Sequence, residues 1–80
     1  MFLEVTMLNS RGVIFEGMAR SVTVPGEQGT FEVLPFHRRL LSRLVLGDIF
    51  IDEKAYSINR GIIKVDQNSV TIVAEGDIEP

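Results

Sequence analysis

The sequence predicts an all-β fold of the sandwich or barrel kind. Apolar and polar residues alternate in short runs, which is the two-residue period of half-buried strands. Turn-forming residues separate these runs at intervals of roughly eight to twelve positions, as in sandwiches and barrels. No long helical period runs through the 80 residues. These observations favour strands over helices throughout the chain.

Two strands are expected at the start of the chain. The first covers residues 3–7, with its apolar side chains on one face. A turn follows at residues 9–12, because asparagine, serine and glycine favour turn conformations. The second strand covers residues 13–16, and strict alternation would place Val13 and Phe15 on the same face.

Residues 22–36 predict a β-hairpin with an exposed tip and a second turn behind it. Pro25 fixes φ at the start of the tip, and the glycines that follow can take the positive φ that tight turns often use. Phe31 and Val33 alternate with polar neighbours, as in a half-buried strand. A proline then ends this strand, shortly before His37, the only histidine in the chain.

The second half of the chain predicts mainly strands. Residues 37–46 leave two structures open, a strand or one or two helical turns, because three leucines there fit a helical period. Further strands are expected over residues 49–51, 56–58, 63–65 and 70–74. Polar segments at 52–54 and 66–69 predict hairpin turns. Gly61 suggests a bulge, since a glycine inside a strand often marks one.

The length indicates one domain. We expect a β-sandwich domain over residues 1–75 and a frayed tail over residues 76–80. Phe36 and Phe50 leave a choice open: each lies in the core if its register shifts by one residue, or is exposed at an interface. A mean hydropathy of +0.20 also points weakly to a protein partner.

The composition excludes several kinds of protein. The chain has no cysteine, so it forms neither a disulfide framework nor a thiolate metal site. Its net charge of −3 disfavours nucleic-acid binding, including an oligonucleotide-binding barrel, because phosphate contacts need a basic face. No apolar run approaches the roughly 18 residues of a membrane span. The absence of a signal-peptide pattern favours the cytoplasm.

His37 has no catalytic signature around it. Ser42 and Glu32 are near it in the sequence, but no nucleophile elbow or oxyanion-hole pattern surrounds them. We therefore expect no enzyme activity, although a small hydrolase using His37 and Ser42 stays an alternative. One histidine is too few ligands for a metal site, and the acidic residues lack calcium-loop spacing. The glycine pair at 26 and 29 lacks the lysine and helix of a phosphate-binding loop, so no cofactor is expected.

Basic residues gather around this histidine. Arg38, Arg39 and Arg43 follow it, and no acidic residue occurs between positions 35 and 47. The cluster is either a solvated rim or a surface that faces a partner.

Several segments, in order along nearly the whole chain, match one family pattern. They are GVIFEG at 12–17, VTVPG at 22–26, GTF at 29–31, VLP at 33–35, H at 37, LLS at 40–42, GIIKV at 61–65 and NSVTIVAE at 68–75. In these segments the chain resembles the epsilon subunit of the rotary, proton-driven ATP synthase, which is called delta in mitochondria.

The resemblance implies a flattened sandwich of two sheets with about ten short strands, about five in each sheet. It implies only the N-terminal sandwich, without the inhibitory C-terminal helical hairpin that family members usually carry. The expected role is a non-catalytic one in the central stalk, binding the gamma subunit and the polar loops of the c-ring to couple proton translocation to ATP synthesis. The protein would lie at the cytoplasmic face of the inner (cell) membrane, attached only through the complex.

The resemblance also implies interface residues. They are Glu27, Gln28, Gly29, Thr30, Phe36, His37, Arg38, Arg39, Leu40 and Leu41. The tip at 27–30 would meet the ring, and the segment 37–41 would meet gamma.

Three departures from the family pattern fall in or near the loop that carries His37. Glu32 and Phe36 stand where the family usually has glycine, and Arg38-Arg39 replace alanine-proline. The alternative reading is a generic all-β protein-interaction module unrelated to the synthase, which would not co-purify with gamma and the ring.

Overall fold

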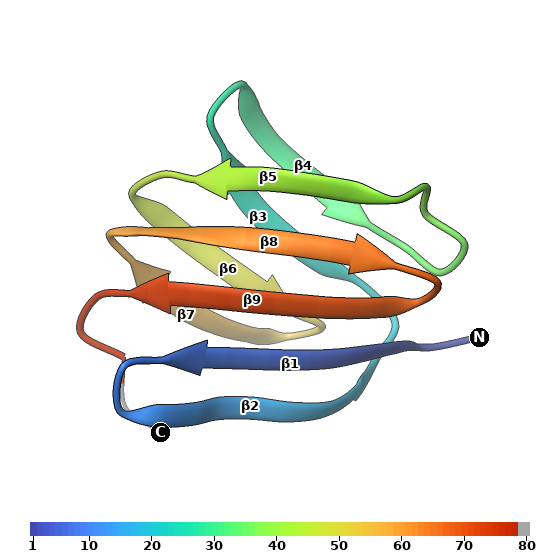
Figure 1. Ribbon diagram of the computed structural model, residues 1–80, viewed down its shortest axis with the longest axis horizontal. Helices are drawn as coiled ribbons and strands as arrows, with labels where there is room; N and C mark the ends of the chain where they lie inside the picture. The colour runs from blue at the N-terminus through green and yellow to red at the C-terminus, as the bar shows by residue number, and fades with distance from the viewer. Residues whose placement is uncertain (79–80) are drawn as a thin grey trace.

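Nine β-strands make up most of residues 1–78, the part of the chain that the computed structural model describes (Figure 1). Their bounds are β1 Leu3–Asn9, β2 Gly12–Ala19, β3 Val22–Gly26, β4 Gly29–Val33, β5 Leu40–Leu44, β6 Gly47–Ile51, β7 Lys54–Ile58, β8 Arg60–Asp66 and β9 Ser69–Glu75. No helix occurs within residues 1–78. The all-β prediction is confirmed, with nine strands where the resemblance implied about ten.

The strands form one hydrogen-bonded sheet that curls into two layers. Its order is β2-β1-β9-β8-β5-β3-β6-β7, and β4 pairs with β3 off this path. Figure 1 shows β2, β1, β9, β8 and β5 in the front layer and the other strands behind. The layers join at a corner where Gly26 pairs with Leu44 and the amide of Val45 donates to the carbonyl of Pro25 at 2.8 Å.

The core lies between the two layers and is entirely apolar in the described part of the chain. The side chains with less than 2% exposure alternate along the strands, as the two-residue period predicts. The largest of them are Leu3, Met7, Ile49, Ile51, Ile58, Ile63 and Ile72. Each such side chain contributes about 1.5–3 kcal/mol to stability through burial. Phe50 is outside this core and is 42% exposed.

The predicted alternation in β2 is wrong at its start, because a bulge interrupts the strand. Met7 of β1 pairs with Phe15, but the next residue of β1, Leu8, pairs with Val13. Ile14 is therefore the extra residue. The inward–outward alternation of side chains changes phase there, so Val13 and Phe15 do not share a face. As a result Val13 is 46% exposed, while Ile14 and Phe15 both pack against the core.

The bulge expected at Gly61 is also wrong. β8 and β9 keep a regular register from Arg60 opposite Glu75 to the end of β8. The glycine is needed instead for close packing, because a Cβ there would lie 2.6 Å from the carbonyl oxygen of Val73.

The open choice over residues 37–46 resolves as a strand. β5 pairs with β8 over five registered residues, from Leu40 to Leu44. Leu44 is buried and Leu40 packs against the core, whereas Leu41 between them is 71% exposed. The leucine spacing that fits a helix thus serves the inner and outer faces of one strand.

The expected tail is described only as far as Ile78, and its last two positions, 79 and 80, lie outside the described residues. Ile78 is 4% exposed. Its carbonyl accepts hydrogen bonds from the side chains of Asn9 and Arg11, both at 3.2 Å. This part of the segment is therefore held against the β1–β2 turn.

Candidate protein-interaction groove

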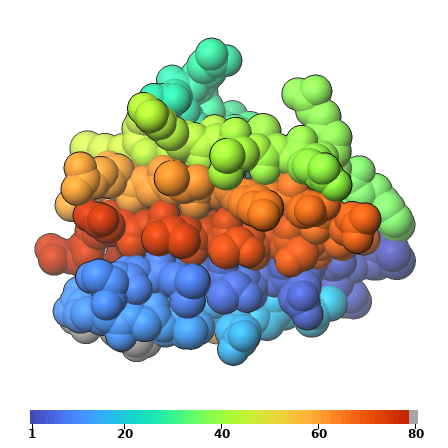
Figure 2. Space-filling model, in the orientation of Figure 1, coloured from blue at the N-terminus to red at the C-terminus, as the bar shows by residue number. Residues whose placement is uncertain are grey.

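An open groove runs along one edge of the sandwich, between the β3–β4 hairpin and β5. Its volume is about 740 Å³. Figure 2 shows the hairpin in teal and the loop before β5 in green as two projections that flank a hollow. The lining residues are Gly26, Glu27, Gln28, Gly29, Thr30, Phe31, His37, Arg38, Leu40, Leu41, Ser42, Arg43 and Ile62. We refer to this feature as the edge groove.

The β3–β4 hairpin forms one wall. Gly26 pairs with Gly29 across the two-residue loop Glu27-Gln28. A Cβ on Gly26 would lie 2.9 Å from the carbonyl oxygen of Gly29, and Gly29 itself has a φ of +124°. Both positions therefore require glycine. The tight turn leaves Glu27 and Gln28 exposed at the tip.

A turn at residues 34–37 begins the other wall. The amide of His37 donates to the carbonyl of Leu34 at 3.1 Å. Phe36 has a φ of +68°, a left-handed conformation that costs a side chain with a Cβ roughly 1–2 kcal/mol. Its amide donates to Oδ1 of Asn68 at 2.6 Å, which ties this turn to the β8–β9 turn. The backbone thus has the shape that favours glycine, although phenylalanine occupies it.

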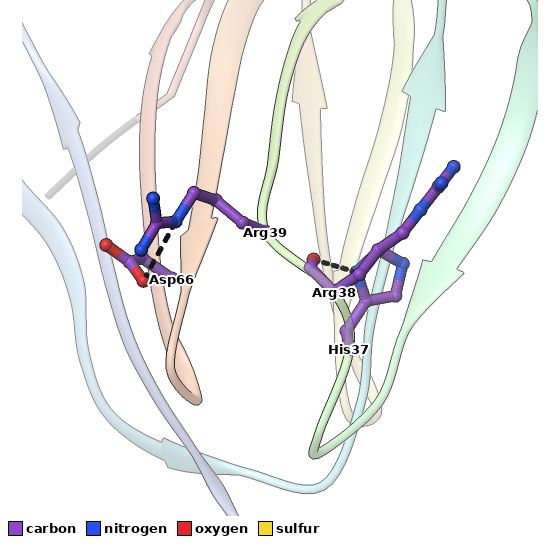
Figure 3. Close-up of polar contacts among 4 residues, drawn as sticks. All are labelled: His37, Arg38, Arg39 and Asp66. Atoms are coloured by element: carbon purple, nitrogen blue, oxygen red, sulfur yellow. Dashed lines mark hydrogen bonds and ion pairs between the residues drawn. The ribbon is translucent and has the colours of Figure 1, made fainter.

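Arg38 and Arg39 point to opposite sides of the loop (Figure 3). Nε of Arg39 lies 3.4 Å from Oδ1 of Asp66, with the two side chains 76% and 40% exposed. An ion pair this exposed contributes at most about 1 kcal/mol. Arg38 lines the edge groove and makes no ion pair within residues 1–78. His37 donates from Nδ1 to the carbonyl oxygen of Arg38 at 2.7 Å.

The fold brings most of the expected interface residues to this one feature. Those that line the edge groove are Glu27, Gln28, Gly29, Thr30, His37, Arg38, Leu40 and Leu41. Phe36 and Arg39 are not among the lining residues. Phe36 is nevertheless 72% exposed, at the turn that leads into the groove wall.

Sequence reasoning left out several lining residues. Arg43 is part of the basic cluster in the sequence, so the charge pattern could have identified it as an interface residue. Ile62 carried no such signal, because it lies on the outer face of β8 and reaches the groove only through its pairing with Arg43.

His37 and Ser42 both line the groove, but they do not form the hydrogen-bonded pair that the hydrolase alternative requires. Ser42 donates from Oγ to the carbonyl of Arg43 at 3.1 Å, while His37 bonds the carbonyl of Arg38. Each side chain is therefore bonded to backbone and not to the other. Within the described residues no group of three or more potential metal ligands occurs. Residues 1–78 also contain no helix with the length and apolarity needed to cross a bilayer.

Comparison with known proteins identifies a family. The family model described as "ATP synthase, Delta/Epsilon chain, beta-sandwich domain" matches residues 2–80. The chain is 39% identical over 80 residues to the ATP synthase epsilon chain of Aliarcobacter butzleri, which covers 95% of this chain and 64% of that relative. It is 40% identical over 81 residues to the epsilon chain of Sulfurimonas denitrificans, with 95% and 62% covered.

Solved structures share the fold. A chain in the cryo-EM structure of the Euglena gracilis mitochondrial ATP synthase (OSCP/F1/c-ring, rotational state 1) matches with a TM-score of 0.81 at 20% identity, covering 94% of this chain and 51% of that one. A chain of the Tetrahymena thermophila mitochondrial ATP synthase (central stalk/c-ring) matches with a TM-score of 0.75 at 17% identity, covering 92% and 63%.

Fold and groove together define a β-sandwich with one open edge. Within that class, the chain belongs to the ATP synthase delta/epsilon family, whose β-sandwich domain it matches. It spans a little under two thirds of the length of these curated relatives, at 64% and 62%.

Proposed function

We propose that this chain acts as an epsilon-type subunit in the central stalk of ATP synthase. In this role it binds the gamma subunit and the polar loops of the c-ring and helps to couple proton translocation to ATP synthesis. The observation that carries the proposal is the family match over residues 2–80. Catalysis takes place in other subunits, and this chain contributes rigidity and binding.

The architecture suits the transmission of force. Interior side chains of proteins pack at the density of organic crystals, so a sandwich core resists deformation. Here the two layers are also joined through backbone hydrogen bonds at the corner of Gly26 and Leu44. A load applied to the hairpin therefore reaches β5 and β8 through hydrogen-bonded strands, with no flexible linker between them.

The exposed segments divide between two partners. The tip at residues 27–30 projects beyond the layers and meets the ring. The segment 37–41 lies along the other wall of the edge groove and meets gamma. Arg38 is available for this contact because it has no ion-pair partner within the described residues. The complex holds the protein at the cytoplasmic face of the inner (cell) membrane.

Binding to the cognate gamma subunit tests this proposal. We expect a stoichiometric complex on size exclusion. Changing both Arg38→Ala and Arg39→Ala should weaken it by about tenfold, which is the effect of losing about 1.4 kcal/mol of contacts to charged groups.

A charge-matched control removes positive charge elsewhere. The control carries Arg11→Ala in the β1–β2 turn and Lys54→Ala at the start of β7. β1, β2 and β7 are not neighbours of β5 in the sheet order. This control should bind as the unchanged chain does. Failure of the unchanged chain to bind gamma would reject the proposed function, and full affinity of the Arg38/Arg39 variant would reject the arginine contacts.

A further inference from the structure

β4 is an edge strand with few of the features that usually protect one. Within the described residues it pairs only with β3, so its outer edge is open. Proteins usually blunt such edges with charged side chains, lysine above all, with proline or with a bulge, because the free backbone groups otherwise pair with another chain. β4 has the sequence GTFEV, which contains no lysine or proline, and its register with β3 is regular. Glu32 is its one charged side chain. The edge is thus suited to receive another strand.

The strands at the two ends of the sheet path differ from β4. β2 carries the bulge at Ile14, and β7 begins with Lys54. Nζ of Lys54 lies 5.5 Å from the centre of the Phe15 ring, so these two edges also lie against each other. The sandwich therefore protects its edges on the side of β2 and β7 more strongly than it protects the edge of β4.

The β3–β4 register determines which backbone groups of β4 are free. Pro25 lies opposite Thr30 and has no amide hydrogen, so this pair does not exchange hydrogen bonds. Bonded and non-bonded pairs alternate along an antiparallel ladder, so Thr30 and Glu32 direct their N–H and C=O groups away from β3. A hydrogen bond of Pro25 is consistent with this register: its carbonyl points away from β4 and accepts a hydrogen bond from the amide of Val45.

The facing wall of the edge groove supplies positive charge and apolar surface. Arg38 and Arg43 line the groove, and neither has an ion-pair partner within residues 1–78. Glu27 is the single acidic residue among the described lining residues. Leu41, 71% exposed, adds apolar area between the two arginines. A segment with both acidic and apolar side chains complements this wall.

We propose that β4 receives an additional strand from a partner protein. The occupant is an extended segment with acidic and apolar side chains, which exchanges backbone hydrogen bonds with Thr30 and Glu32 and places carboxylates near Arg38 and Arg43. Main-chain pairing provides affinity in this mode of recognition, and side chains provide specificity. The inference rests on the proposed function, under which the segment belongs to the gamma subunit. Thr30, at the base of the tip, then faces the ring with its side chain and gamma with its outward backbone groups.

Amide hydrogen exchange in the complex with cognate gamma tests the added strand. The amides of Thr30 and Glu32 should exchange at least about tenfold more slowly in the complex, since hydrogen-bonded strand amides are protected from exchange. Unchanged exchange at both amides in a chain that has bound gamma would overturn the inference and leave the proposed function standing. Failure to bind gamma at all would instead reject the proposed function.

A proline substitution tests the same contact independently. Thr30→Pro removes an outward amide without breaking the β3–β4 ladder, because that amide is not bonded to β3. Its affinity for gamma should fall about tenfold relative to Thr30→Val, which keeps the amide. Equal affinities of the two folded variants would overturn the inference. Circular dichroism establishes that each variant is folded, and if the proline variant is not, exchange in the unchanged chain decides.

Discussion

The left-handed conformation of Phe36 allows a quantitative test. Phe36 has a φ of +68°, and its side chain is 72% exposed, so the ring loses little stabilising burial when it is removed. Phe36→Gly keeps the backbone amide that donates to Asn68 and removes the Cβ that makes this conformation unfavourable. The variant should be more stable than the natural chain.

The size of the effect follows from two opposing contributions. Relief of the left-handed strain stabilises the folded state by roughly 1–2 kcal/mol. The greater freedom of glycine in the unfolded chain offsets about 0.5–1 kcal/mol of this. The free energy of unfolding should therefore rise by about 0.75 kcal/mol, the middle of a range of about 0–1.5 kcal/mol, and the middle value raises Tm by about 3–6 °C for a domain of this size.

Thermal and urea unfolding of Phe36→Gly measure this change, with Phe36→Ala as the matched control. The alanine variant also lacks the ring but keeps the Cβ, so it should gain no stability from relief of strain. If Phe36→Gly is no more stable than Phe36→Ala, the reasoning from backbone strain is refuted. Phe36 is also one of the expected interface residues, so if its phenyl ring contacts gamma, both variants should bind gamma more weakly than the natural chain does.

Two other substitutions test the packing and the ion pair. Gly61→Ala places a Cβ against the carbonyl of Val73 and should lower stability by about 1–3 kcal/mol in urea unfolding, whereas Gly17→Ala, whose nearest neighbour would lie 3.6 Å away, should change it little. Arg39→Ala breaks the exposed pair with Asp66 and should cost less than about 1 kcal/mol, an effect that weakens further in added salt. A large loss of stability in Arg39→Ala, or none in Gly61→Ala, would contradict these expectations.

The strands could be predicted because burial imposes a period on the sequence. Alternation identified the inner residues of most strands, such as Ile49 and Ile51, without knowledge of their partners. The leucines of residues 40–44 could not be assigned in the same way. Their spacing satisfies a helical and a strand period, and pairing with β8 decided between them.

The missed bulge at Ile14 and the mistaken bulge at Gly61 have a common physical cause. A bulge or a close approach depends on the strand that lies opposite, and the sequence of one strand does not contain that neighbour. The extra residue Ile14 is defined by the register of β2 with β1, and Gly61 is required by the backbone of β9.

The candidate site was only partly predictable. Turn chemistry and the basic cluster indicated the tip at 27–30 and the segment 37–41, and the family resemblance made them interface candidates. Their meeting along one groove follows from the curl of the sheet, which brings β5 beside the β3–β4 hairpin.

The order of residue types alone determined the all-β class, the tight turn at 26–29 and the family, because each is encoded in local period, backbone preference or motif. Only the tertiary structure decided that the β4 edge stays open, that Phe36 adopts a glycine conformation, and that Arg38 and Arg43 face one groove. These features depend on which strands become neighbours, and strand pairing joins residues far apart in the chain through contacts that no local pattern records.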